Sequence, residues 1–407
     1  MTHTNGERTT QVWIVAPVDQ LDCRVWGLTG VERLHRTLTA AGIPSGHISV
    51  GSLASLSRTR TEALAIFRAD YVFDERLVHG VLATPGAVLL ASSEETASLS
   101  PVAAVHAPPN TLTEAVSLFS GEEQGGTGAV RSTALGAGLS AVTPLELVPA
   151  YTSTLRKTDA PYLLALTSAT VGEVEARLFA ASYKGITDLV TKWVWPRPAR
   201  LVTRWCVSTG VSPNLVTSVS WVLVILAAVL FLGGWFGLGL VAAWVMTFLD
   251  TVDGKLARVT LTSTKIGHVL DHGLDLLHPP FWYLAWAYGL PPETSGLWLA
   301  TVVTVGGYVV GRLLEGLFLL LFKMEIHCWH PLDSFFRTIT ARRNPNLILL
   351  SLATLMGRPD TGLVLVAWWT AICIGFHAVR LLQAFVQQGQ GVPIREWQGV
   401  QAEGKIT

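Results

Sequence analysis

The chain has 407 residues, of which 50% are hydrophobic and 14% charged, and its formal net charge is zero. That length predicts two or three domains. Because the net charge is zero, the overall composition gives no argument for nucleic-acid binding. Four widely spaced cysteines without a CxxC pair argue against a disulfide scaffold and against a zinc ribbon. Up to about residue 184 the composition is that of a soluble protein, whereas long apolar runs typical of a membrane domain dominate from about 215 to 385.

The first 183 residues alternate strand-like and helix-like segments. "QVWIVAP", "HISV" and "GAVLLAS" predict strands, and "GVERLHRTLTAAGI" predicts a helix that ends at Gly42. Such alternation indicates a parallel sheet covered by helices. We therefore expect a cytoplasmic, Rossmann-like α/β domain over residues 1–183.

The stretch 188–205, "DLVTKWVWPRPARLVTRW", mixes three tryptophans with basic residues. This composition suits a segment that lies at the level of the lipid headgroups, although a simple basic flank that fixes the topology explains it equally well. We place an interfacial juxtamembrane segment at 184–212, a membrane domain at 213–390 and a cytoplasmic tail at 391–407.

Six apolar segments predict transmembrane helices, of which the second and fifth are short for a bilayer. Basic residues precede the first segment and separate the fourth from the fifth, whereas the connections "LGGWFGLG", "PPETSG" and "GRPDTG" carry almost none. By the positive-inside rule both termini are cytoplasmic, in a cell inner or plasma membrane. The predicted segments are 215–232, 236–249, 273–290, 297–322, 346–357 and 361–385.

Four aspartates lie between the second and third of these segments. Asp250 and Asp253 are three residues apart, and Asp271 and Asp275 are four apart, so each pair lies on one face of its own helix. Four hard carboxylates without a soft ligand favour Mg²⁺ or Mn²⁺ over zinc, and two such ions would leave positions open for a pyrophosphate. The alternative is a solvated acidic helix end.

The residues between the aspartates favour a nucleotide at this site. Gly254 and Ala257 are small residues on the same helix face as Asp250, which gives room for a nucleotide. Arg258 adds a guanidinium beside the phosphates. Gly267, one turn before Asp271, permits a close approach of helices.

The complete pattern, D-x2-D-G-x2-A-R-x8-G-x3-D-x3-D, resembles at every fixed position the signature of the CDP-alcohol phosphotransferase (CDP-alcohol phosphatidyltransferase) family of integral membrane enzymes. Upstream, Pro213, Asn214 and Thr217 resemble the PNxxT start of the first membrane helix of that family. The resemblance covers about 184–385. It implies that a hydroxyl acceptor displaces CMP from a CDP-linked donor while the phosphate stays on the product, in phospholipid or polar phosphodiester synthesis.

The resemblance also implies roles for individual residues and for a partner chain. Asp250, Asp253 and Asp271 are implied metal ligands, and Asp275 is implied as the base that takes the acceptor proton, with a place among the metal ligands. Asn214 and Thr217 are implied to bind the nucleotide together with Gly254, Ala257 and Arg258. The family resemblance also implies a homodimer that is surrounded by membrane lipids.

Several other polar residues stand in apolar surroundings. Arg312 and Glu315, three residues apart, either pair with each other or face an acceptor pocket. Three arginines at the active-site side either bind an acceptor phosphate or serve topology and lipid headgroups; they are Arg337, Arg342 and Arg343.

Two histidine patterns invite a zinc interpretation. His268 and His272 are four residues apart, and "HCWH" contains His327, Cys328 and His330. No family role is implied for the first pair, which we interpret as supporting or interfacial side chains, and "HCWH" lacks a second pair of ligands, so we expect it to pack within a loop.

The soluble domain has a weaker resemblance of its own. "WGLTGVERLHRTLTAAGI" and "ADYVFDERLVHGVL" resemble parts of nucleotidyltransferase domains, in which Asp70 would stand at an aspartate-bearing strand end. No glycine-rich loop with arginine and lysine follows "VWIVAP", and "YLLALTSATVGEVEARL" has no aspartate for a second metal ligand. We therefore expect a non-catalytic relative.

Two alternatives to a single transferase activity stay open. One is a bifunctional enzyme that also makes its CDP-alcohol in the first domain. The other, of a different class, is a divalent-cation transporter, which should carry ionisable groups through the depth of the membrane rather than at one rim.

Overall fold

A computed structural model describes residues 10–16, 23–56, 63–91, 101–120, 127–263, 265–292 and 296–403, with the backbone alone for 120, 127, 265–272, 274, 275 and 403. The chain divides into two compact units. The first comprises Met1–Tyr151 with Asp159–Ala181, and the second comprises Thr152–Thr158 with Ser182–Thr407. The predicted domain boundary at 183 therefore falls two residues past the end of the first unit.

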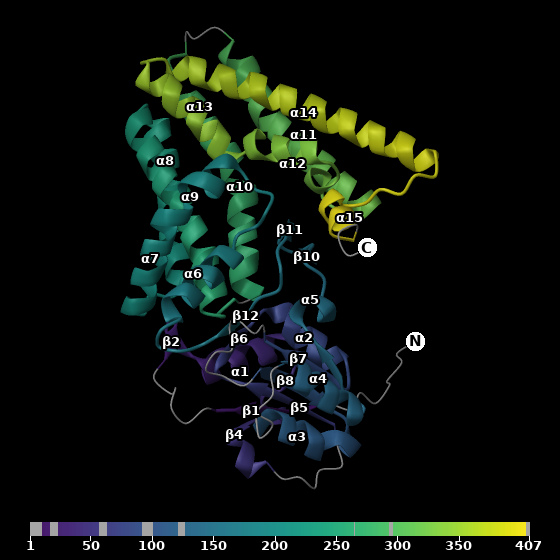
Figure 1. The fold of residues 1–407 in the computed structure, drawn as a ribbon. Helices are drawn as coiled ribbons and strands as arrows, with labels where there is room; N and C mark the ends of the chain where they lie inside the picture. Colours follow the sequence, from purple (N-terminus) through teal and green to yellow (C-terminus); the bar gives the residue numbers. More distant parts are fainter. Residues whose placement is uncertain are drawn as a thin grey trace. The chain divides into compact units, whose positions relative to one another are not determined.

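The first unit is built on a six-stranded sheet with the order β4-β1-β5-β8-β7-β9 (Figure 1). The strands are β1 (Gln11–Val15), β4 (Ile48–Gly51), β5 (Leu64–Arg68), β7 (Ala87–Leu90), β8 (Val102–Ala107) and β9 (Ser140–Val142). The three strands expected from the sequence correspond to β1, β4 and β7.

The sheet is mixed, so the expectation of a parallel sheet is wrong at one strand. Strand β8 runs antiparallel to both β5 and β7, whereas β1 is parallel to β4 and β5, and β7 is parallel to β9. The connection from β7 to β8 has only eleven residues, which is too short for a parallel crossover of a dozen or more. An antiparallel return is the pairing that this short connection permits.

Helices cover both faces of the sheet because the strands alternate their buried side chains. Val12 and Ile14 of β1 pack in one core with α1 (Gly30–Ala40) and α2 (Glu75–Ala83). Trp13 packs in the other core with α3 (Leu112–Ser120) and α4 (Thr127–Gly136). The first unit is therefore an α/β domain with three layers (Figure 1).

Helix α1 begins and ends where the sequence indicates. Thr29 and Glu32 form a capping box at its start, with each side chain bonded to the backbone of the other. The helix ends at Ala40, and Gly42 follows with φ +92°, a conformation that glycine adopts without strain. The remaining elements of the first unit are β2 (Arg24–Val25), β3 (Leu28–Thr29), β6 (Tyr71–Phe73), α5 (Pro144–Leu147), β12 (Leu163–Ala165) and α6 (Val171–Ala181). Strand β10 (Tyr151–Thr152) begins at the last residue of the first segment of this unit, and its partner β11 (Lys157–Thr158) belongs to the second unit.

The second unit is helical. Its helices are α7 (Pro196–Thr209), α8 (Pro213–Leu232), α9 (Phe236–Val259), α10 (Lys265–Gly289), α11 (Leu297–Phe322), α12 (Pro331–Ile339), α13 (Arg343–Leu355), α14 (Pro359–Gly389) and α15 (Trp397–Glu403) (Figure 1). Among the described residues four helices are long and apolar enough to cross a membrane, namely α8, α9, α11 and α14. The other two predicted spans fall on α10 and α13, so the count of six spans stays a prediction.

The core of the bundle holds α8, α9 and α10 together. Phe231 of α8 packs against Trp282 and Trp286 of α10, and Met246 of α9 lies in the same cluster. Gly289 ends α10 against this cluster, where an added Cβ would lie 1.9 Å from the carbonyl oxygen of Phe231, so only glycine fits there. This packing fixes α9 and α10, the two helices that bear the four aspartates.

Helix α9 is longer than the apolar segment predicted for it. The predicted span stops at residue 249, but the helix continues to Val259 and carries Asp250 and Asp253 on its last turns. The charged residues after position 249 end the apolar segment but not the helix, because this stretch also contains Lys, Leu and Arg, which are good helix formers.

The predicted interfacial stretch forms a π-helical turn, Val190–Val194, followed by α7. Trp193, Leu201 and Trp205 are exposed on it, beside basic residues. This arrangement suits a membrane surface, and that location stays a prediction.

Candidate active site

The first pair of aspartates is held by one helix and two neighbours. Asp250 and Asp253 lie one turn apart on α9. Thr217 Oγ1 of α8 donates to Asp253 Oδ2 at 2.6 Å, and Arg343 Nη2 of α13 donates to Asp250 Oδ2 at 2.6 Å. Asp253 is buried, and Asp250 is largely so. Burial of carboxylates is costly unless cations or donors compensate it, and Thr217 and Arg343 supply such compensation here.

The second pair of aspartates lies on the backbone of α10. Asp271 and Asp275 are four residues apart within that helix, as the spacing predicts, and their side chains lie outside the described residues. The same limit applies to His268 and His272. Leu276, the residue after Asp275, lines the cavity described next.

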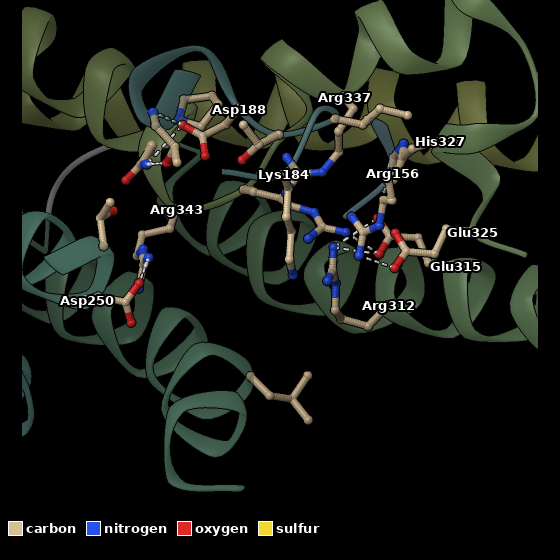
Figure 2. Close-up of a pocket in the computed structure, with 18 of the residues that line it drawn as sticks. Arg156, Lys184, Asp188, Asp250, Arg312, Glu315, Glu325, His327, Arg337 and Arg343 are labelled. Carbon is tan, nitrogen blue, oxygen red and sulfur yellow. Dashed lines mark hydrogen bonds and ion pairs between the residues drawn. The ribbon is translucent and has the colours of Figure 1, made fainter. Parts of the chain in front are cut away.

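A cavity of about 600 Å³ opens beside Asp250 (Figure 2). Among the described residues, eight lysines and arginines and four acidic residues line it, an excess of four formal positive charges. The cavity therefore favours an anionic ligand. The basic residues are Arg156, Lys184, Lys255, Arg258, Arg312, Arg337, Arg342 and Arg343, and the acidic residues are Asp188, Asp250, Glu315 and Glu325.

Most of the predicted site residues meet in this cavity. Gly254, Arg258 and the four predicted acceptor arginines line it together with Asp250. Asp253 is not among the described residues that line the cavity and is bonded to Thr217 of α8. Asn214 is exposed and Ala257 half-buried, and neither is among the residues that line the cavity as described.

Glu315 anchors two of the arginines at one end of the cavity. Arg342 Nη2 lies 2.5 Å from Glu315 Oε2, and Arg312 Nη2 lies 2.7 Å from the same oxygen and 2.9 Å from Oε1. Arg312 and Glu315 therefore pair with each other, as one of the two interpretations has it, and both line the cavity, whose role as an acceptor pocket stays a prediction. Figure 2 shows this group well separated from the Asp250–Arg343 pair.

Arg337 differs from the other arginines. Its Nε and Nη1 atoms are buried and have no hydrogen-bond partner among the described residues. Burial, together with the charge of Arg342, lowers the pKa of Arg337 to about 9, so the group still carries its charge at neutral pH. Two buried guanidinium nitrogens without an acceptor at a cavity wall are costly unless a ligand supplies one.

Sequence reasoning missed the residues that the segment before the membrane domain contributes. Asp188 accepts from the backbone N–H of Val190 and of Thr191, and Asn344 Nδ2 donates to it at 2.9 Å. Burial raises the pKa of Asp188, but Arg337 and the donated hydrogen bonds outweigh burial, so this pKa lies below its usual range. An aspartate one or two residues before a helical turn was the available signal.

Lys184 was missed as well. It lines the cavity, and burial together with Arg156 and Arg258 lowers its pKa. The loop that carries it is fixed to α9, because Lys255 Nζ and Arg258 Nη1 donate to the carbonyl oxygen of Ser182 at 3.0 and 2.7 Å. Arg258, a predicted nucleotide-binding residue, and its neighbour Lys255 thus also position the loop.

Comparison with known proteins identifies the class of this site. The family model for CDP-alcohol phosphatidyltransferase matches residues 210–339, which run from the start of α8 to the end of α12. Cholinephosphotransferase 1 of Danio rerio is 30% identical over 98 residues, which cover 21% of this chain. The match spans about a quarter of that relative, 26% of its length. Residues 210–339 therefore form a domain of the CDP-alcohol phosphatidyltransferase family, as the aspartate signature predicts.

Proposed function

We propose that the chain is a metal-dependent CDP-alcohol phosphotransferase. A CDP-linked donor and a hydroxyl acceptor meet in the cavity beside Asp250, and CMP leaves while the phosphate that bears the donor alcohol passes to the acceptor. The observation that carries the proposal is that Asp250, Gly254 and Arg258 of the family's signature line a cavity whose described residues carry four more formal positive than negative charges. A transporter is less compatible with charges gathered at one cavity.

The chemistry of the donor set fits Mg²⁺ or Mn²⁺. Asp250 and Asp253 offer only hard oxygen atoms, and Asp271 and Asp275 would add two more carboxylates. Two such ions, when bound, stabilise the charge that develops on the phosphates and on the leaving CMP. Thr217 holds Asp253 in place through its hydroxyl donor, and Arg343 must share Asp250 with any ion that binds there.

The chain's own residues would bind and orient both substrates. Arg258, at the cavity wall, contributes a guanidinium for the donor phosphates. Asp275 takes the proton of the acceptor hydroxyl as the acceptor oxygen forms its bond to the transferred phosphorus. Its position rather than a raised pKa makes it a base, because neighbouring cations keep a carboxylate acidic.

We infer that the acceptor carries an anionic group. The Nε and Nη1 atoms of Arg337, which have no acceptor among the described residues, and the charge of Lys184 favour a phosphate on the side of the cavity away from Asp250. Arg312 and Arg342 complete this wall through their ion pairs with Glu315.

A substrate panel tests the proposal. Purified full-length protein is incubated with lipid-linked and water-soluble CDP-alcohols, each with neutral and phosphorylated polyols, in Mg²⁺ or Mn²⁺. We expect one combination to yield CMP and a phosphodiester product, both seen by mass spectrometry. Release of CMP from none of the donors would contradict the assignment.

Gly254→Leu should block the nucleotide without disturbing the fold. An added Cβ at Gly254 meets nothing within 4 Å, and leucine forms helix better than glycine. A leucine side chain would extend into the cavity, so we expect CDP affinity to fall about tenfold or more, which is ~1.4 kcal/mol or more. Titration calorimetry measures this. Gly172→Leu, at another open glycine on α6, is the matched control, and normal CDP binding in Gly254→Leu would contradict the proposed nucleotide face.

The first domain should make no CDP-alcohol. Asp70 is buried and bonded to Arg68 at 2.5 and 3.0 Å, and Asp74 caps α2 and pairs with Arg76 at 2.8 Å, so both carboxylates already serve the fold. We expect full-length protein to release no pyrophosphate from CTP with any sugar or polyol phosphate, in a coupled pyrophosphate assay. Release that disappears in Asp70→Asn would establish the bifunctional alternative instead.

We further propose a homodimer with both termini in the cytoplasm. Apolar side chains such as Leu226, Val229 and Leu299 are exposed on α8 and α11, as lipid or a second chain requires. Cross-linking in native membranes that yields monomer alone would count against the dimer. Labelling of a terminal cysteine from the outer side of intact cells would count against the orientation.

A further inference from the structure

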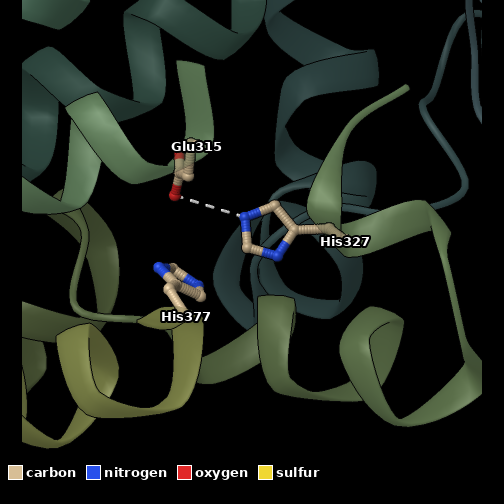
Figure 3. Close-up of side chains that lie close together, drawn as sticks. All are labelled: Glu315, His327 and His377. Atoms are coloured by element: carbon tan, nitrogen blue, oxygen red, sulfur yellow. Dashed lines mark hydrogen bonds and ion pairs between the residues drawn. The ribbon is translucent and has the colours of Figure 1, made fainter. Parts of the chain in front are cut away.

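Two histidines and a glutamate from three different elements meet inside the second unit (Figure 3). Glu315 lies on α11, His327 in the 3₁₀ turn Ile326–Cys328, and His377 on α14. Their ligand atoms all lie within 4.8 Å of one another. His327 Nε2 is 3.3 Å from Glu315 Oε1, and the two imidazole rings are 5.2 Å apart between centroids.

The two imidazoles have unmet hydrogen-bonding capacity. His327 is 1% exposed and His377 is 2% exposed. Nδ1 of His327 and both ring nitrogens of His377 have no hydrogen-bond partner within the described part of the chain. A neutral imidazole has one N–H donor and one lone pair, and leaving both unused in a buried site is unfavourable. Either a metal ion or a water molecule would meet this need.

We propose that Glu315, His327 and His377 bind a divalent transition-metal ion of the zinc class. Two imidazole nitrogens and one carboxylate oxygen are a donor set that such ions prefer, with a fourth position left for water or an anion. This site is separate from the carboxylates of α9 and α10, whose hard oxygen atoms suit Mg²⁺ or Mn²⁺. Neither Cys328 nor His330 is among the three proposed ligands, so the "HCWH" segment contributes only its first histidine, His327.

The arginines on Glu315 decide how the ion can be accommodated. Arg342 contacts Oε2, whereas Oε1 faces His327 and also receives Arg312. An ion on Oε1 therefore requires Arg312 to keep only its contact with Oε2, at 2.7 Å. Because these positive charges oppose a dication, the fourth ligand should be hydroxide or another anion. Glu315 and His327 line the cavity, which gives the ion and its anion an entrance.

The test uses full-length protein without a histidine tag, stripped with a chelator and then dialysed against Co²⁺ or Zn²⁺ in excess Mg²⁺. We expect about one Zn²⁺ retained per chain, the visible absorption of four-coordinate Co²⁺, and tighter retention when inorganic phosphate is present. The retained ion should be lost in His377→Ala. His106→Ala is the matched control, because His106 is equally buried but already bonds the carbonyl oxygen of Val81 at 3.0 Å through Nδ1.

A second measurement needs no variant, in case His377→Ala fails to fold. X-ray absorption at the zinc edge should show two nitrogen ligands at about 2.0 Å. Purely oxygen ligation, equal retention by wild type and His377→Ala, or the absence of a retained ion would each overturn the proposal and leave water as the partner of the histidines. None of these readouts depends on transferase activity.

Discussion

Asp253→Asn is expected to lower CMP-releasing turnover by about 10³-fold, which is ~4 kcal/mol of barrier at about 1.4 kcal/mol per decade. Asparagine keeps an oxygen that accepts the hydrogen bond from Thr217, so the geometry between α8 and α9 should survive. What is lost is one negative charge for the ions that stabilise the transferred phosphate. The measurement is the initial rate of CMP release at saturating donor and metal.

The stability of the same variant gives an independent prediction. Asp253 is 4% exposed, and an ionised carboxylate buried to that degree is costly when no cation is bound. The metal-free variant should therefore unfold at the same temperature as metal-free wild type or at a higher one. Asp360→Asn, at a partly exposed aspartate that pairs with Arg358, is the control for both measurements and should keep full activity. Activity above about a tenth of wild type in Asp253→Asn would count against the metal assignment.

Arg337→Met is expected to raise the KM for the phosphorylated acceptor by about 10- to 100-fold. Hydrogen bonds to a charged group contribute about 1.5–3 kcal/mol, and Nε and Nη1 of Arg337 have no other hydrogen-bond partner among the described residues. Methionine fills a similar volume without a buried charge, so the variant should be as stable as wild type or more so. Steady-state kinetics at saturating donor and a thermal melt measure the two effects.

Arg358→Met provides the matched comparison, because Arg358 is exposed and pairs with Asp360 outside the cavity. It should change neither the acceptor KM nor the melting temperature. An unchanged acceptor KM in Arg337→Met would mean that the acceptor reaches the site without an anionic group. A strongly destabilised Arg337→Met protein would mean that the guanidinium serves the fold.

The sequence predicted the part of the site that lies on a single helix. Asp250 and Asp253 follow a spacing that one helix turn imposes, and α9 does carry them to its end. The PNxxT segment and the aspartate signature are connected in the structure by the bond from Thr217 to Asp253. Local spacing and the resemblance to a family signature are sufficient for such residues, because neither depends on how distant segments pack.

Residues brought in by tertiary packing could not be predicted in the same way. Glu315 forms an ion pair with Arg312 of its own helix, which the spacing indicates. It also forms an ion pair with Arg342, which is 27 positions away along the chain. Asp188 and Lys184 enter the cavity from a loop that Lys255 and Arg258 fix to α9. No periodicity in the sequence marks such a contact.

The fold of the first unit shows a similar division. The strand segments β1, β4 and β7 and the helix α1 follow from apolar runs and from the turn at Gly42. The direction of β8 does not follow from its sequence, because a buried strand has the same apolar pattern whether it is parallel or antiparallel to its neighbours. Only the short connection between β7 and β8 carried that information, through its length.

The most direct test of the central claim is the stoichiometry and metal dependence of CMP release by the full-length protein. With the donor and acceptor that the panel selects, CMP and phosphodiester product should appear in a one-to-one ratio. Both should stop on chelation and resume when Mg²⁺ or Mn²⁺ is restored. CMP release that continues after chelation, or that proceeds without transfer of the donor's phosphate to the acceptor, would contradict a metal-dependent CDP-alcohol phosphotransferase.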